Sequence, residues 1–325
     1  MTRRWLIALP LFLIGTFLFG LIFHHAGLTW SDFRNTIQSL NPALVLLCLA
    51  LLSCVFLLSA LKWQLVTEAQ STKRLGLLYY FRYVCLAVFM GQALPMTLAN
   101  AATRAFAMKR REVMPIAKTT GLFLWDQGFD LIALGLLVFS GLLHFFFKMQ
   151  WMTSVLCFLL GVIAIILLMP LFLGIVIWIA SLMGKLKLVP GPLREKCIGL
   201  QRTGILNPAL ARKLFLLSTA KFTTSALFYT AIIMAYGFTN MSLIAFWGAP
   251  SAELAGILSQ MPGGLGALDW TWMGIMVNNG LTPQVAAALT LGIRCLLLSA
   301  YVITTGITWS IYLLVFRARR HGLQD

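Results

Sequence analysis

Six ionisable residues lie within or beside long apolar stretches of the sequence: Arg104, Asp126, Asp130, Glu253, Asp269 and Arg294. A charge at the centre of a membrane helix costs about 2.5–3.5 kcal/mol on insertion scales, so such residues need partners or water. Asp126 and Asp130 are four residues apart and share one helix face. We expect Arg104 to pair with one of them, and Arg294 to pair with Asp269 or Glu253. Such pairs could bind a charged ligand, carry protons or only fix helix packing.

The segment from Ser259 to Asp269 reads SQMPGGLGALD. Its glycines, Gly263, Gly264 and Gly266, precede a short stretch that predicts a helix. The N–H groups at a helix N-terminus favour anions such as phosphate, and glycines leave those groups uncovered. The same glycines would serve a tight turn with positive φ. The segment therefore predicts an anion site, a tight turn or both, and it is no P-loop because no G-K-[ST] follows.

The composition is that of a membrane protein. Of the 325 residues, 60% are hydrophobic and 10% are charged, whereas soluble domains carry about 25% charged residues. The formal net charge of +16 fits cytoplasmic loops held against anionic lipid, and we expect no nucleic-acid partner. We expect membrane lipids as partners, with anionic headgroups at the cytoplasmic face, and the sequence leaves a homo-oligomer open.

Motifs for metal binding or catalysis are missing from the sequence. The four histidines show no H-x-x-x-H or H-E-x-x-H spacing, and the six cysteines form no C-x-x-C. No G-x-S-x-G elbow occurs. The paired aspartates lack a nucleophile or metal to work with. We therefore expect no catalytic residue, no metal and no cofactor.

Apolar runs and prolines predict six full spans and two broken ones. The full spans are 5–23, 42–61, 119–143, 152–182, 214–236 and 284–314. Pro95 and Pro262 interrupt the stretches 77–108 and 243–278. The limbs after these prolines are roughly 20 Å long at 1.5 Å per residue, too short for a bilayer core of about 30 Å. We predict two re-entrant helical hairpins that enter from opposite sides.

Basic residues orient this arrangement. It places 18 of the 25 basic residues on the cytoplasmic side, Lys62 and the basic loop 184–213 among them, and leaves Arg34 and Lys148 outside. Lys221 is expected near a cytoplasmic helix end, with its amine reaching the interface. Both termini are then cytoplasmic, and we expect the cytoplasmic (inner) membrane of a bacterium.

The two halves of the chain share a pattern. Asp126 follows Pro95 by 31 residues, and Arg294 follows Pro262 by 32. We predict one membrane domain, 1–325, with pseudo-repeats at about 42–143 and 214–314. Because the halves enter from opposite sides, this is an inverted-topology repeat, which in transporters brackets a site near the midplane. The predicted fold class is an all-α polytopic membrane protein.

These motifs together resemble the membrane domain of lysylphosphatidylglycerol synthases and their stand-alone, flippase-like relatives. The resemblance covers roughly 40–315 and rests on three motifs. They are Leu94-Pro95 with Arg104; Asp126-Gln127 with Asp130; and Pro262-Gly263-Gly264-x-Gly266 with Asp269 and Arg294. The chain departs from the pattern at Ala99, Asn100, Ala101, Gln127 and Asp269, where the resemblance leads one to expect glycines, an acid, an arginine and a glutamate.

The resemblance implies a flippase-like protein that binds a phospholipid, glycolipid or isoprenoid lipid and moves it between leaflets. No soluble synthase domain is expected. The implied headgroup-binding residues are Arg104, Asp126, Asp130, Gly263, Gly264, Gly266, Asp269 and Arg294. Secondary candidates are Pro95, Asn100, Gln127, Glu253, Gln260 and Pro262. Two alternatives stay open: an enzyme or accessory subunit in lipid or lipid-linked glycan synthesis, and a small-solute secondary transporter.

Overall fold

The computed structural model describes residues 40–185 and 207–321, together with Gly20, Leu21, Ser31, Arg34 and Gln38. The predicted first span, 5–23, and most of the basic loop 184–213 lie outside the described residues. The regular elements of the described part are all helices. They are α3 (Pro42–Glu68), α4 (Leu77–Met90), α5 (Met96–Arg110), α6 (Ile116–Phe146), α7 (Trp151–Lys185), α9 (Pro208–Ala235), the 3-10 turn η1 (Thr239–Met241), α10 (Ser242–Ser259), α11 (Ala267–Asn278) and α12 (Pro283–His321).

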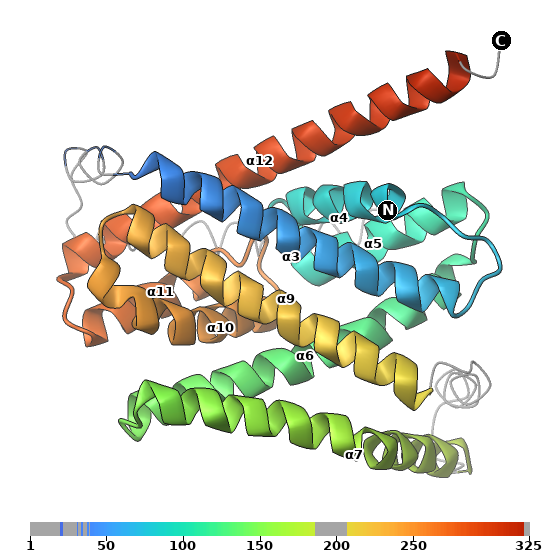
Figure 1. Ribbon diagram of the computed structural model, residues 1–325, viewed down its shortest axis with the longest axis horizontal. Coiled ribbons are helices and arrows are strands. Elements are labelled where there is room, and N and C mark those ends of the chain that lie inside the picture. The colour runs from blue at the N-terminus through green and yellow to red at the C-terminus, as the bar shows by residue number, and fades with distance from the viewer. Residues whose placement is uncertain are drawn as a thin grey trace.

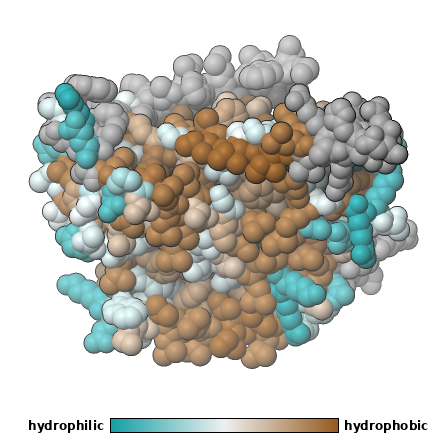
Figure 2. All heavy atoms as spheres, turned by 45° about the horizontal axis from the view of Figure 1, so that its top comes forward, coloured by the Kyte–Doolittle hydropathy of each residue, from teal (hydrophilic) through white to brown (hydrophobic). Residues whose placement is uncertain are grey.

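Within the described residues, six helices are long and apolar enough to cross a membrane. Five of them, α3, α6, α7, α9 and α12, match predicted spans, and the sixth is α10 with the turn before it. Figure 2 shows a broad apolar surface, with hydrophilic residues gathered toward its left and right margins, where the helices of Figure 1 end. The predicted class, an all-α polytopic membrane protein, is confirmed.

The same four residues, Asn-Pro-Ala-Leu, begin both α3 and α9. Asn41 Oδ1 accepts a hydrogen bond from the Ala43 amide, 3.0 Å away. Asn207 Oδ1 accepts from the Ala209 amide at 2.8 Å. An asparagine cap followed by proline is a strong helix start, because it satisfies a free N–H and presets φ. The two helices pack against each other and run in opposite directions (Figure 1). The inverted repeat stays a prediction.

Two helix pairs occupy the places of the predicted hairpins. A short turn at residues 91–95 joins α4 to α5, and residues 260–266 join α10 to α11. The first pair lies in the right half of the bundle and the second in the left half, with both turns near the middle (Figure 1). Whether each pair enters and leaves on one side of a membrane stays a prediction.

The two turns touch. Pro95 and Pro262 form an isolated antiparallel bridge, and the amide of Gly263 donates to the carbonyl of Gly91 at 2.7 Å. The hydroxyl of Thr97 also donates to Gln260 Oε1 at 2.5 Å. Segments that are far apart in the sequence are therefore joined through main-chain and side-chain bonds at the centre of the bundle.

The remaining helices surround this junction. Helix α9 packs on α3, α6, α7 and α10, while α12 packs on α4 and α11. Helix α7 lies along one edge of the bundle (Figure 1), and Leu156, Leu159, Leu160 and Leu167 on it are exposed. Exposed leucines along a helix of this hydropathy fit contact with lipid tails.

Candidate functional site

A cavity of about 220 Å³ lies inside the bundle beside the junction of the two turns. Apolar side chains such as Leu52, Phe56, Val84, Phe228 and Leu297 form much of its wall. Seven charged residues complete it: Lys62, Arg104, Asp126, Asp130, Lys221, Glu253 and Arg294. An apolar pocket with a few convergent polar groups is the usual form of a ligand site.

Asp126 on α6 receives two cations. Arg104 Nη1, from α5, lies 2.8 Å from Asp126 Oδ2, and Lys62 Nζ, from α3, lies 2.9 Å from Oδ1. The Arg104 guanidinium also lies over the rings of Trp63 and Phe123, at 5.2 and 5.0 Å from their centroids. The expected pairing of Arg104 with one of the two aspartates is confirmed, and the partner is Asp126.

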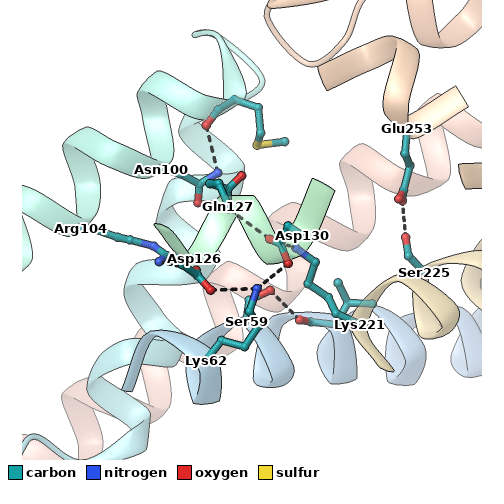
Figure 3. Close-up of polar contacts among 12 residues, drawn as sticks. Ser59, Lys62, Asn100, Arg104, Asp126, Gln127, Asp130, Lys221, Ser225 and Glu253 are labelled. Carbon is teal, nitrogen blue, oxygen red and sulfur yellow. Dashed lines mark hydrogen bonds and ion pairs between the residues drawn. The ribbon is translucent and has the colours of Figure 1, made fainter. Parts of the chain in front are cut away.

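Asp130, one helical turn later, joins the same network. Lys62 pairs with its Oδ1, and Lys221 Nζ, from α9, lies 2.6 Å from its Oδ2. Gln127 Nε2 donates to Oδ2 at 3.1 Å. Figure 3 shows the lysines approaching the aspartates from two different helices. Three cations and two carboxylates from α3, α5, α6 and α9 thus form one network.

The predicted positions of Lys62 and Lys221 near the cytoplasmic interface are wrong. The apolar run ends at residue 61, but α3 continues to Glu68, so Lys62 lies inside the bundle with 1% of its side chain exposed. Lys221 lies in the middle of α9, with 16% of its side chain exposed. One signal was available in the sequence: two aspartates beside a single arginine leave one negative charge without a partner.

Arg294 on α12 is held differently. Its Nε lies 2.6 Å from Asp269 Oδ1 and its Nη2 lies 2.9 Å from Asp269 Oδ2. Nη1 donates to the carbonyl of Gly263 at 2.6 Å. Of the two partners expected for Arg294, Asp269 is confirmed and Glu253 is not its partner. The bond to Gly263 ties α12 directly to the turn between α10 and α11.

The glycine segment forms a tight turn with positive φ at Gly263 (59°), Gly264 (66°) and Gly266 (80°). A Cβ on Gly264 would also lie 3.3 Å from the Cα of Gly256. The amide of Gly266 donates to Asp269 Oδ2 at 2.9 Å, so the first free N–H of α11 is satisfied within the chain. Gly263 and Gly264 line the cavity, and anion binding at this turn stays a prediction.

A family model described as the lysylphosphatidylglycerol synthase TM region matches residues 6–307. The chain belongs to this family. The resemblance carried by the three motifs is thereby confirmed. A search of curated proteins found no match.

For a member of the lysylphosphatidylglycerol synthase TM family, the chain differs at the centre of the second motif. Gln127 stands where the family resemblance leads one to expect an arginine. The structure brings Lys62 and Lys221 to the neighbouring Asp130. Positive charge is therefore present beside the motif, supplied by two other helices.

The secondary candidates divide into two groups. Asn100, Gln127 and Glu253 line the cavity, as do the main candidates except Gly266 and Asp269. Pro95, Gln260 and Pro262 form the junction between the turns. Among the described residues, no group of three His, Cys, Asp or Glu side chains is placed to hold a metal ion.

Proposed function

We propose that this protein binds a lipid with a polar headgroup and moves it between the two leaflets. The observation that carries the proposal is the cavity at the junction of the two turns, which combines charged groups with an apolar wall. A headgroup would lie in the cavity while its tails stay beside the apolar surface of the helices. Membership of the lysylphosphatidylglycerol synthase TM family supports the same reading.

Arg104 and Lys221 are the residues we assign to an anionic headgroup. Arg104 Nε is buried and has no hydrogen-bond partner in the described part of the chain. Lys221 is the most exposed of the three cations in the network, and it has one carboxylate partner. Both therefore keep a donor for a phosphate oxygen, and hydrogen bonds to charged groups contribute about 1.5–3 kcal/mol.

We further propose that the α4–α5 and α10–α11 pairs are re-entrant hairpins from the cytoplasmic and external sides. The opposed directions of α3 and α9 and the meeting of the two turns support this topology. Single cysteines at Lys109 and Asn279, in a chain without other cysteines, test it. A membrane-impermeant thiol reagent in intact cells should label position 279 and spare position 109. External labelling at 109 would overturn the topology.

The function itself is tested in vesicles with purified protein and tail-labelled phosphatidylglycerol, phosphatidylethanolamine or phosphatidylcholine. Chemical quenching of the outer-leaflet label measures exchange between leaflets. We expect at least one lipid to exchange faster with protein present, and Lys221→Met to slow this by about tenfold or more, as expected for a lost charged hydrogen bond. Lys213→Met is the matched control, because Lys213 is an exposed lysine of the same helix.

Equal exchange with and without protein for every lipid class would contradict the proposal. Mass spectrometry of the recovered lipids separates the main alternative, because a membrane enzyme would change the mass of its substrate. Lipids that co-purify with the wild-type protein identify the headgroup class to test first.

A further inference from the structure

Glu253 differs from the other carboxylates near the cavity. It lies on α10, and its one described partner is Ser225 on α9, whose hydroxyl donates to Glu253 Oε1. No lysine or arginine of the described residues forms an ion pair with it, whereas Asp126 and Asp130 each have two such partners and Asp269 has one. Figure 3 shows the Glu253–Ser225 pair set apart from the network around Asp130.

The charges around the cavity leave a role for this carboxylate. Arg294 and Asp269 form one balanced pair. The network of three cations (Lys62, Arg104 and Lys221) and two carboxylates (Asp126 and Asp130) carries one positive charge in excess. An ionised Glu253 balances that excess when no ligand is bound. Balance matters here because an uncompensated charge away from water is costly.

An anionic headgroup changes this balance. A phosphodiester brings one negative charge to Arg104 and Lys221, so the cavity would carry a net negative charge with Glu253 ionised. Proton uptake from water converts the carboxylate to a neutral carboxylic acid and restores the balance. We propose that Glu253 binds one proton when a headgroup with a single negative charge binds, so that lipid and proton enter the cavity together. This inference rests on the proposed lipid-binding function.

The surroundings favour Glu253 over its neighbours as the proton site. The other charged or titratable groups that share the cavity wall are Lys62, Arg104, Asp126, Asp130, Lys221, Tyr229, Arg294 and Tyr301. Asp269 forms an ion pair with Arg294. His144 on α6 has a ring contact with Trp247 of α10. A proton on Asp126, Asp130 or Asp269 would weaken an ion pair. A proton on Glu253 affects one hydrogen bond from a neutral hydroxyl.

The test measures binding of short-chain phosphatidylglycerol and phosphatidylcholine to the purified protein across neutral pH. For the wild-type protein, the Kd of phosphatidylglycerol should rise about tenfold per pH unit above a midpoint, because one proton is linked to binding. In a weakly buffered solution, a pH-sensitive dye should report uptake of about one proton per bound lipid. Phosphatidylcholine, whose headgroup has no net charge, should show neither effect.

Glu253→Gln should bind phosphatidylglycerol with nearly the same Kd at all these pH values and without proton uptake. Its amide has the size of the carboxylic acid and keeps an acceptor for Ser225. Glu68→Gln is the matched control, since Glu68 ends α3 away from the cavity and bonds to Gln64. Ser225→Ala is a second variant. It removes a bond to the ionised form, so the midpoint should move to higher pH.

Three outcomes overturn the inference and are distinguishable from failure of the proposed function. If phosphatidylglycerol binds with a pH-independent Kd, or if Glu253→Gln keeps the wild-type slope, lipid binding stands and proton coupling by Glu253 is wrong. If neither lipid binds at any pH, both are wrong. An unchanged midpoint in Ser225→Ala would also contradict the assignment, and this variant keeps the test decisive if Glu253→Gln does not fold.

Discussion

Arg104 and Arg294 both line the cavity, yet their guanidinium groups are held in opposite ways. Arg294 contacts both oxygens of Asp269 and a main-chain carbonyl, so each of its three nitrogens has a partner. Arg104 has one carboxylate contact, shares that carboxylate with Lys62, and leaves its Nε without a partner in the described part of the chain.

The difference teaches which half of the site is rigid. A planar guanidinium that is fully bonded fixes geometry and has little left to offer a ligand. The network around Arg104 holds one cation in excess and retains donors, so it can exchange partners. Arg294 thus secures the turn between α10 and α11, while the network around Arg104, which includes Lys221 of α9, presents charge to the cavity.

The largest effect should come from Arg294→Gln. The substitution leaves the carboxylate of Asp269, which is 0% exposed, without its cation, and breaking a buried pair costs about 3–5 kcal/mol. Denaturant unfolding in mixed micelles measures the loss. The double variant Arg294→Gln with Asp269→Asn should recover part of it, because no charge is then stranded. Equal losses of stability in the single and double variants would contradict the view that the Arg294–Asp269 pair is the rigid part of the site.

A smaller loss is expected for Arg104→Ala. Asp126 keeps Lys62 as a partner at 2.9 Å, so we expect a cost near that of one charged hydrogen bond, about 1.5–3 kcal/mol. Adding Asp126→Asn should give a loss smaller than the sum of the two single losses. Strict additivity would mean that the two residues do not interact, and a loss as large as that of Arg294→Gln would contradict the comparison.

The smallest loss in this series should come from Gly264→Ala. Its φ of 66° is in the left-handed region, which costs a residue with a Cβ about 1–2 kcal/mol. Gly121 on α6 is the matched control, because a Cβ there meets nothing within 4 Å. Gly121→Ala should leave stability unchanged or raise it by up to ~1 kcal/mol. Thermal unfolding in detergent compares them, and equal midpoints would argue against a strained turn.

The sequence was informative about the partners of charged residues in apolar stretches, because burial in a membrane limits which partners they can have. A charge in an apolar stretch needs a partner, and this rule predicted that Arg104 pairs with Asp126 or Asp130, and Arg294 with Asp269 or Glu253. The rule did not place Lys62, because hydropathy marks where an apolar run ends and not where the helix ends. Lys62 follows the run but belongs to α3, which continues to Glu68.

The contact between the two turns could not be predicted from the sequence at all. Pro95 and Pro262 each indicate a break in a helix, but neither spacing nor periodicity states that the two breaks meet. Their contact depends on how α4, α5, α10 and α11 pack in three dimensions. The repeat pattern indicated matching elements, and the structure supplied their meeting point.

The bond from the Gly263 amide to the Gly91 carbonyl has a consequence for hydrogen exchange. Proline has no N–H, so neither residue of the Pro95–Pro262 bridge can contribute an exchangeable amide hydrogen. The Gly263 amide therefore reports on this contact, although it lies in a turn that would ordinarily exchange quickly. Its protection factor gives the free energy of separating the two turns without any introduced label.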